Sequence, residues 1–417
     1  MRLVPLKNLT PGDRLGDGVY ERNGTLLLAD GMPLTESHLL ALRQRGVATL
    51  YIQDDRTRDV RPKLPISATT RRQVKRNLRQ TFETLAERLR PMGGLTLGAK
   101  INPNDPALRQ AIRTEVRSTL GPDGVNQIVS DVDRLLDDLM DDTLVSGLGN
   151  LREHDAYTYE HSVDVTIVGL LLARRAGWEG RRLRLFGLGL LLHDIGKLFV
   201  EPELLNKEAG LTDEEFDRIK RHPELGYLLL RELVPAMGPL PTQVAYQHHE
   251  RQDGKGYPRG LKGSNRLGRN EANMIHDFGS VAAVADVYDA LVSDRAYRPG
   301  YPVDHAVRLI TGLAGTHLNR RAVDVFRKVV APFPVCTEVV VQTGPYTGFR
   351  GIVTAVDNKR LDRPRIRLLC TPQEKDIPPI DLDLAQDPAL MIASATAPPN
   401  DAAGDEGAPG AAASPAA

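Results

Sequence analysis

The pattern of hydrophobic and polar residues divides the chain into regions with different periods. Within residues 1–55, two short apolar runs, "GTLLLADG" and "VATLYI", are typical of strands and are flanked by turn signals. Between them, "TESHLLALRQRG" has a helical pattern in which Thr35 would cap the helix and Gly46 would end it. These features predict a small α+β module at the start of the chain.

An amphipathic helix is expected over residues 71–90, after a linker at 56–70. Apolar side chains recur there at steps of three or four with Arg and Lys between them: Val74, Leu78, Phe82, Leu85 and Leu89. We expect this helix to pack on the rest of the chain with its basic face in solvent. The alternative is that it joins two copies of the chain into a homodimer.

Helical patterning continues from Ala107 to about Val145, with one break at "GPDG", so a linker and helical segment is expected over 56–149. Residues 150–332 are strongly helical and carry most of the histidines. The period then changes, because "TEVVVQTG", "GFRGIVTAVD" and "RPRIRLLC" are β-branched runs separated by turns. They predict a β-rich appendage over 333–393. Residues 394–417 have no bulky apolar side chain and are expected to be disordered.

These elements predict a mainly α protein with a helical core between two small accessory regions. The chain has 417 residues and a net charge of zero, so it has no overall attraction to a nucleic acid polymer or an anionic membrane. No apolar run approaches the about 18 residues of a membrane span, and the N-terminus lacks a secretory segment. Two cysteines, Cys336 and Cys370, do not indicate a disulfide framework, and a cytoplasmic location is expected.

The stretch "GLLLHDIGKLFV", residues 189–200, places His193 and Asp194 side by side in an apolar run. Two polar titratable groups in a buried helix cost several kcal/mol unless each has a partner. They therefore either bond to the fold or hold a ligand. A single buried histidine is more often of the first kind, so the choice depends on the other polar residues that share this pattern.

Seven side chains share that pattern, each on or at the end of an apolar helical run: His161, His193, Asp194, His222, His248, His249 and Asp286. If all faced one core, only cations could neutralise the cluster. Imidazole and carboxylate ligands without thiolate suit iron, manganese, zinc or nickel. Seven ligands exceed what one tetrahedral ion takes, and a carboxylate can bridge two ions. Two metals about 3.5–4 Å apart are a recurrent arrangement for displacement at phosphorus.

At these residues the sequence resembles a known family. "HDIGK" (193–197) resembles the HD phosphohydrolase motif, and "HHERQDGKGYPRGLKG" (248–263) resembles the second motif of the HD-GYP family, with Gly256, Tyr257 and Pro258 as its "GYP". "HPELG" (222–226) and "ADVYDALVSDRAYR" (285–298) follow the family in the same order. The likeness covers residues 150–332.

The resemblance implies a phosphodiesterase that hydrolyses cyclic di-GMP to pGpG through a hydroxide bridging two divalent ions, with iron or manganese expected. Members of the family often continue to GMP, and the sequence leaves the final product open. His161, His193, Asp194 and Asp286 would hold one ion. Asp194 would bridge to a second ion held by His222, His248 and His249.

The resemblance also implies the substrate contacts. Lys197 would act with Asp194 in catalysis by holding a phosphate oxygen. The loop of Gly256, Tyr257 and Pro258 would lie against the guanine-bearing ligand, and Arg295 and Arg298 would contact the second phosphate or a base.

Three departures from the family pattern affect the expectations. Gln252 stands where an aromatic residue is common before "DG", and Tyr157 replaces a Glu that helps some members bind a third metal. We therefore expect two ions and not three. The stretch 264–280 is about nine residues longer than usual and contains His276 and Asp277; we expect an exposed loop, with a lid as the alternative. His154, on the face of His161, is expected to support the site from outside the ligand set.

Two other functions remain open from the sequence. The chain could be a sensor that binds cyclic di-GMP without turnover, which missing metal ligands would favour. It could also be an HD phosphohydrolase acting on another cyclic dinucleotide or a nucleotide, which the intact "GYP" motif disfavours.

Overall fold

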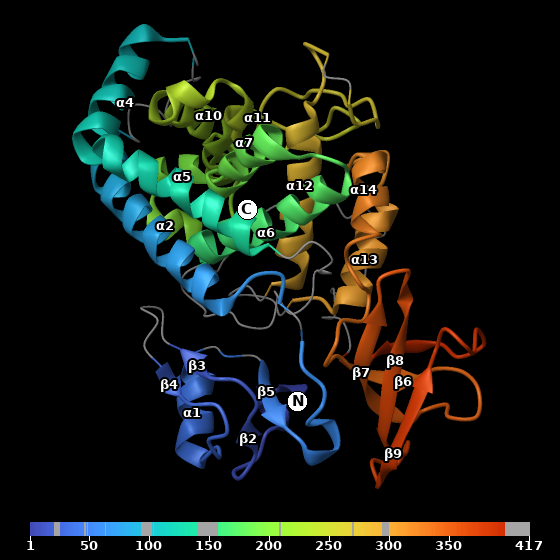
Figure 1. The fold of residues 1–417 in the computed structure, drawn as a ribbon. Coiled ribbons are helices and arrows are strands. Elements are labelled where there is room, and N and C mark those ends of the chain that lie inside the picture. Colours follow the sequence, from blue (N-terminus) through green and yellow to red (C-terminus); the bar gives the residue numbers. More distant parts are fainter. Residues whose placement is uncertain are drawn as a thin grey trace.

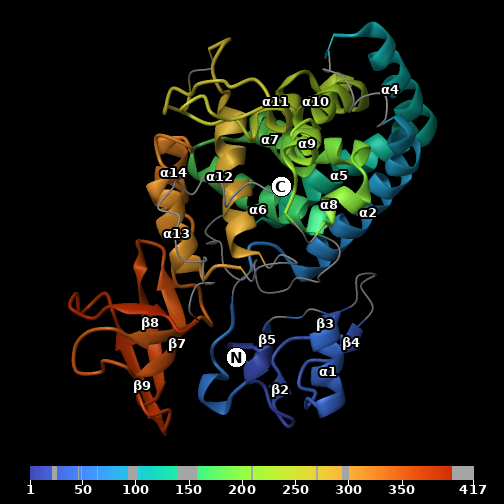
Figure 2. The same cartoon turned by 180° about the vertical axis from the view of Figure 1, so that it is seen from behind.

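The computed structural model describes residues 1–20, 26–45, 47, 49–62, 64–92, 102, 104–139, 157–207, 210–268, 271–293 and 300–396. A large helical body occupies the upper part of Figure 1, and two small units, one from each end of the described chain, lie side by side below it. The opposite view in Figure 2 shows the same arrangement. The protein is mainly α with two β-containing accessory regions, as the sequence predicted.

The first unit is an α+β module. Its main sheet has the order β1 (Arg2–Pro5), β5 (Thr49–Gln53), β2 (Arg14–Leu15), and β3 (Val19–Tyr20) pairs with β4 (Leu26–Leu28). Helix α1 (Glu36–Gln44) begins as predicted, because the Thr35 hydroxyl accepts a hydrogen bond from the backbone of His38. Short η1 (Leu6–Asn8) and η2 (Asp55–Thr57) turns complete the module.

Helices α2 (Ala68–Leu89), α4 (Pro106–Thr119) and α5 (Gly121–Asp138) wrap one side of the helical body, with the turn η3 (Arg90–Met92) after α2. The apolar stripe of α2 is buried in the main core, which confirms that this helix packs on its own chain. The predicted break lies at Gly121, whose φ of +56° an L side chain rarely adopts.

The helical body contains the long helices α6 (Tyr157–Arg175), α7 (Gly180–Leu191), α10 (His222–Leu233) and α12 (Asp277–Val292). Shorter elements connect and cover them: η5 (Ile195–Phe199), α8 (Pro202–Leu205), α9 (Asp213–Ile219), η6 (Pro235–Met237), α11 (Leu240–Gln247), α13 (Val303–Gly312) and α14 (Arg320–Phe326). Helix α12 is apolar on every side and is buried along its whole length, so it forms the centre of the body. No helix in these described ranges is long and apolar enough to cross a membrane.

The second unit is an antiparallel sheet with the order β10 (Ile392–Ser394), β6 (Glu338–Val341), β7 (Arg350–Asp357), β8 (Arg360–Cys370), β9 (Asp376–Asp383). The three runs predicted as strands correspond to β6, β7 and β8. Strands β9 and β10 were not predicted. Ordered structure continues through Ser394, the first residue of the predicted tail, whose hydroxyl donates to Asp304; residues 397–417 lie outside the described residues.

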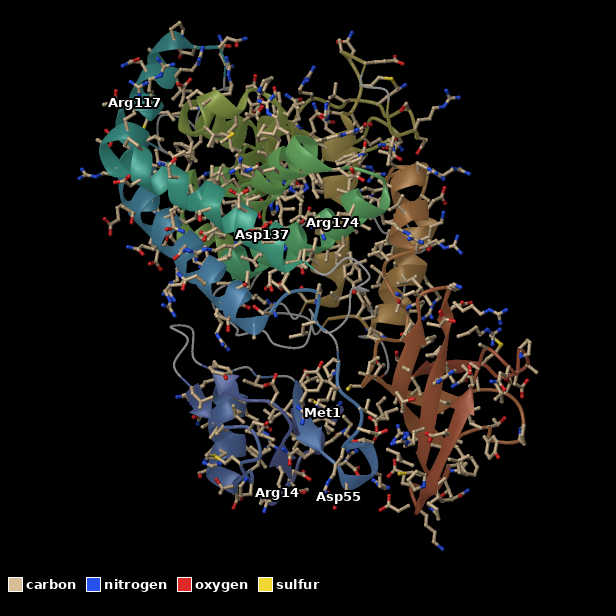
Figure 3. All side chains as sticks on the ribbon, in the orientation of Figure 1. Met1, Arg14, Asp55, Arg117, Asp137 and Arg174 are labelled. Atoms are coloured by element: carbon tan, nitrogen blue, oxygen red, sulfur yellow. The ribbon has the colours of Figure 1, made fainter. Side chains whose placement is uncertain are left out.

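The two small units are bound to each other. Arg367 of β8 pairs with Asp59, Arg56 pairs with Asp376, and the Leu3 backbone N–H donates to the Cys336 carbonyl. Figure 3 shows Met1 and Asp55 on the side of the module that faces the sheet. The start of the predicted linker at 56–70 is therefore structured: the Met1 ammonium donates to the carbonyls of Thr57 and Val60, and Val60 is buried.

Candidate metal centre

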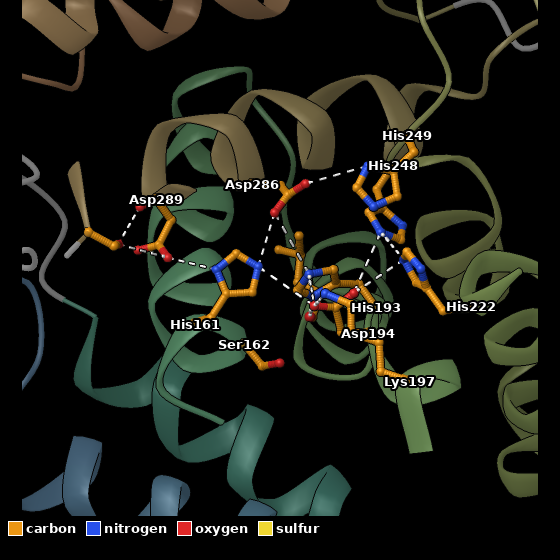
Figure 4. Close-up of polar contacts among 12 residues, drawn as sticks. His161, Ser162, His193, Asp194, Lys197, His222, His248, His249, Asp286 and Asp289 are labelled. Atoms are coloured by element: carbon orange, nitrogen blue, oxygen red, sulfur yellow. Dashed lines mark hydrogen bonds and ion pairs between the residues drawn. The ribbon is translucent and has the colours of Figure 1, made fainter. Parts of the chain in front are cut away.

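Five elements bring the seven predicted ligands into one buried cluster (Figure 4). His161 lies on α6, His222 begins α10, and Asp286 lies on α12, whereas His248 and His249 directly follow α11. The sequence predicted that His193 and Asp194 lie inside a helix, and this was wrong: α7 ends at Leu191, and both residues lie in the turn that follows it.

The turn at His193 and Asp194 is set by a close approach between two elements. A Cβ atom at Gly196 would lie 1.9 Å from the carbonyl oxygen of His222, so only glycine allows η5 to pack this tightly on α10. This packing directs Asp194 towards the histidines of α10 and α11.

One side of the cluster is formed by His161, His193 and Asp286. The Nε2 atom of His161 lies 3.0 Å from Oδ1 of Asp286, and Nε2 of His193 lies 4.0 Å from the same oxygen. On the other side, Nε2 of His222 lies 3.3 Å from Nε2 of His248. Asp194 lies between the two sides, with Oδ2 3.7 Å from His161 and Oδ1 3.4 Å from His222.

The outer ring nitrogens of four histidines are held by the fold, which leaves Nε2 directed at the cluster. The Nδ1 atoms of His193 and His222 lie 2.8 Å from the carbonyls of Leu190 and Ile219, and that of His248 lies 3.0 Å from two carbonyls. The Nδ1 atom of His161 instead lies 2.7 Å from Oδ2 of Asp289. Such partners fix the tautomer that carries its lone pair on Nε2, as metal-ligating histidines require.

The electrostatics of the cluster favour neutral imidazoles and charged carboxylates. Burial disfavours the imidazolium form and therefore lowers the pKa of four histidines: His193, His222, His248 and His249. The pKa of His248 falls to about 4. Burial alone would raise the pKa of Asp194, but the Lys197 ammonium and the imidazoles outweigh it and hold that pKa well below its usual range. Both forms are those that bind cations.

A cation fits the cluster because several buried polar atoms have no hydrogen-bond partner among the described residues. Nε2 of His193, Oδ1 of Asp194 and Nε2 of His249 are buried and make no hydrogen bond within the described part of the chain. Leaving such atoms unpaired is costly. Three overlapping groups have ligand atoms within 4.8 Å of one another: His161, His193 and Asp286; His193, Asp194 and His248; and His222, His248 and His249.

Lys197 is buried beside the cluster, and its Nζ donates to Oδ2 of Asp194 over 2.8 Å. A buried ammonium at this position is available both to Asp194 and to an anion that approaches the cluster. Its place on η5, one turn after Asp194, agrees with the position expected from the motif.

The "GYP" loop lies against His249, because the Tyr257 ring stacks on the imidazole with centroids 4.7 Å apart. A Cβ at Gly256 would lie 2.4 Å from the backbone N of Arg251, so the loop folds back closely on itself. Glu250 fixes its far side by accepting hydrogen bonds from the backbones of Arg259 and Leu261. Sequence reasoning missed Glu250, although it directly follows the histidine pair.

Asp289 was also missed. It lies three residues after Asp286 on α12, so its position on the same helix face was the available signal. Arg295, Arg298 and His154 lie outside the described residues, and nothing is described of the Tyr157 side chain.

The long stretch 264–280 contributes no residue to the three ligand groups among the described residues. His276 caps α12 by accepting from the Phe278 backbone, and Asp277 pairs with Arg182. Hydrogen bonds of Asn265 hold part of the stretch against the body. Its side-chain amide donates to the Gly315 carbonyl and accepts from the Arg320 backbone N–H, and its own backbone N–H donates to the Gln252 side chain. Gln252, the departure noted in the sequence, is thus buried and anchors this loop.

The part of the chain that carries the cluster matches a known family. Residues 151–321 match the HD domain family. The chain is 35% identical over 240 residues to a cyclic di-GMP phosphodiesterase of Pseudomonas aeruginosa, covering 57% of this chain and 54% of the relative. It is 34% identical over 175 residues to a cyclic di-GMP phosphodiesterase of Thermotoga maritima, covering 42% and 45%.

A 3′3′-cGAMP-specific phosphodiesterase of Vibrio cholerae is 28% identical over 200 residues, covering 48% of this chain and 41% of that protein. The chain spans about half the length of these two cyclic di-GMP phosphodiesterases. The HD family is metal-dependent, which suits the clustered ligand groups. The match of residues 151–321 to the HD domain family agrees with the resemblance to the HD-GYP family carried by the motifs of this chain.

Proposed function

We propose that this protein is a metal-dependent phosphodiesterase that hydrolyses cyclic di-GMP to pGpG, with the further step to GMP left open. The observation that carries the proposal is the buried cluster of five imidazoles and two carboxylates, whose inner atoms converge while the outer ring nitrogens of four histidines are bonded to the fold. The similarity of the chain to proteins named cyclic di-GMP phosphodiesterases supports the choice of substrate.

Two divalent ions, iron or manganese, would be held by these residues. His161, His193, Asp194 and Asp286 are proposed to hold one, and His222, His248 and His249 to hold the other, with Asp194 shared. When bound, such ions would polarise a phosphodiester and make water nucleophilic near neutral pH. A third ion is not expected, since the phenol of Tyr157, with an ordinary pKa near 10, is a poor ligand at neutral pH.

The chain's own residues would bind and orient the substrate. Lys197 is proposed to hold a phosphate oxygen beside Asp194, because a buried ammonium stabilises developing negative charge more strongly than an exposed one. Tyr257, between Gly256 and Pro258, would set the wall of the site against the ligand. Arg295 and Arg298 are proposed to contact the second phosphate or a base, since a guanidinium can do either.

The remaining organisation is proposed as follows. Residues 150–332 would form the catalytic unit, 1–55 and 333–393 accessory regions, 56–149 a linker and helical segment, and 394–417 a tail whose first residue ends β10. A homodimer through the 71–90 helix remains a prediction. It would have to use the polar face of that helix, because the apolar face is buried in the main core.

The test is to purify the protein without oxygen, count bound metals, and follow cyclic di-GMP by chromatography, with 3′3′-cGAMP in parallel. We expect two ions per chain and pGpG appearing before GMP. Binding without turnover would instead indicate a sensor, and faster turnover of 3′3′-cGAMP would indicate a different cyclic dinucleotide as substrate.

A further inference from the structure

A buried ion pair joins α2 to α6 next to the candidate metal centre. Nη2 of Arg71 donates to both carboxylate oxygens of Asp164, over 2.7 and 2.8 Å. The Asp164 side chain is 0% exposed and that of Arg71 10%. Asp164 lies three residues after His161 on α6, so the pair acts on the turn of helix that carries this ligand.

A second ion pair lies one turn along both helices. Lys75 of α2 pairs with Glu160 of α6, the residue that precedes His161. Two cations four residues apart on α2 therefore bind two carboxylates four residues apart on α6. This match between the two helices fixes both the rotation of α6 and its position along its axis.

The pairs do more than attach α2. The apolar stripe of α2, including Val74, Leu78 and Phe82, already buries this helix in the core. A buried ion pair adds little net stability over an apolar contact, because the desolvation of both charges offsets their attraction. The pair instead favours one arrangement of the two helices. Any arrangement that separates the partners leaves a charge buried without its counter-ion, which is costly.

The geometry that it specifies reaches the metal ligands. On its other side, His161 meets α12, with Nε2 3.0 Å from Asp286 and Nδ1 2.7 Å from Asp289. Helix α6 is thus held between α2 and α12. The ion pairs to α2 and the His161 contacts to α12 together set the position of the His161 ring. A rotation of α6 that lengthened the Arg71 contact would also move Nε2 relative to Asp286.

We propose that Arg71 is a positioning residue for His161, so that a helix outside residues 151–321 completes the metal-binding group of His161, His193 and Asp286. The proposal rests on the proposed function in assigning metals to this group. It is specific to one side of the cluster, because neither α2 ion pair involves the helix or turn that carries His222, His248 or His249.

The test measures Mn²⁺ binding to the metal-free full chain by calorimetry, with Arg71→Met compared to Arg76→Met. Arg76 is an exposed residue on the same helix, so this control makes the same chemical change without touching α6. We expect Arg71→Met to lower the Mn²⁺ affinity of one site about tenfold and to leave that of the other unchanged. Such a loss is typical when a residue that supports a metal ligand is removed. The control should change neither.

A double-mutant cycle makes the assignment to His161 explicit. In a His161→Ala background, Arg71→Met should no longer alter Mn²⁺ affinity, because the residue through which it acts is gone. Arg71→Lys keeps the charge and should give a Mn²⁺ affinity between those of the wild type and Arg71→Met. If Arg71→Met does not fold, Arg71→Lys replaces it in the comparison with and without His161→Ala.

A lower melting temperature of metal-free Arg71→Met with both Mn²⁺ affinities unchanged would overturn the proposal, because the pair would then be only structural. Weakening of both sites equally would also overturn it. No nucleotide is used, so a failure to hydrolyse cyclic di-GMP contradicts the proposed function while leaving this coupling intact, and loss of the coupling leaves the proposed function intact.

Discussion

The Nδ1 atom of His161 lies 2.7 Å from Oδ2 of Asp289, so a carboxylate orients this candidate ligand. The Nδ1 atoms of His193, His222 and His248 lie beside backbone carbonyls instead. A carboxylate makes the imidazole a stronger electron donor than a carbonyl does. Replacing Asp289 by Ala should therefore lower metal affinity about 10- to 100-fold. Metal titration of the variant checks this, and unchanged affinity would show that the contact is incidental.

Lys197 is predicted to affect chemistry more than metal binding. Lys197→Ala removes the ammonium 2.8 Å from Asp194, and kcat for cyclic di-GMP should fall on the order of 100-fold with little change in KM. Metal content, measured on the same preparation, should stay at the wild-type value. Loss of metal would instead show that Lys197 serves mainly to hold Asp194 in place.

Glu250 is predicted to act on substrate binding through the "GYP" loop. Its carboxylate accepts from the backbones of Arg259 and Leu261, and Gln keeps the shape but offers one acceptor oxygen in place of two. Glu250→Gln should raise KM several-fold, keep both metals and change kcat less. A fall in kcat with unchanged KM would contradict a role in loop placement.

The metal-free protein is predicted to lose stability on mild acidification. Burial lowers the pKa of His248 to about 4, whereas the unfolded value is 6.5. Because the unfolded state binds the proton more tightly, this stability is present above pH 6.5 and is lost as the pH falls towards 4.

For His248 alone the loss is roughly 3 kcal/mol, and the neighbouring histidines act in the same direction. Thermal melts between pH 7 and pH 5, with a chelator and with Mn²⁺, would measure about 2 kcal/mol of this loss, and the metal should flatten the curve near pH 7. A melting temperature that rises as the pH falls would contradict these shifts.

The sequence predicted those features that depend on local pattern. Thr35 was identified as a cap from its place before a helical run, and the stripe from Val74 to Leu89 was identified as buried from its period. The seven candidate metal ligands were identified together because each is a polar residue in an otherwise apolar run, where a buried charge needs a reason.

Contacts between distant residues were not predictable. Arg71 and Asp164 are 93 positions apart, and Arg367 and Asp59 are 308 apart, so no local period connects them. Strand β9 contains Pro378 and Pro379, which normally argue against a strand. The sheet tolerates them because β9 is an edge strand.

We propose that the cluster around Asp194 binds two metals that are needed to cleave cyclic di-GMP. Anaerobically purified wild-type protein and Asp194→Ala should be compared by recording metals per chain and cyclic di-GMP turnover on the same samples. We expect two metals and turnover for the wild type, with turnover abolished and metal content lowered in the variant, because both ions would share this carboxylate. An Asp194→Ala protein with two bound metals and full activity would contradict it.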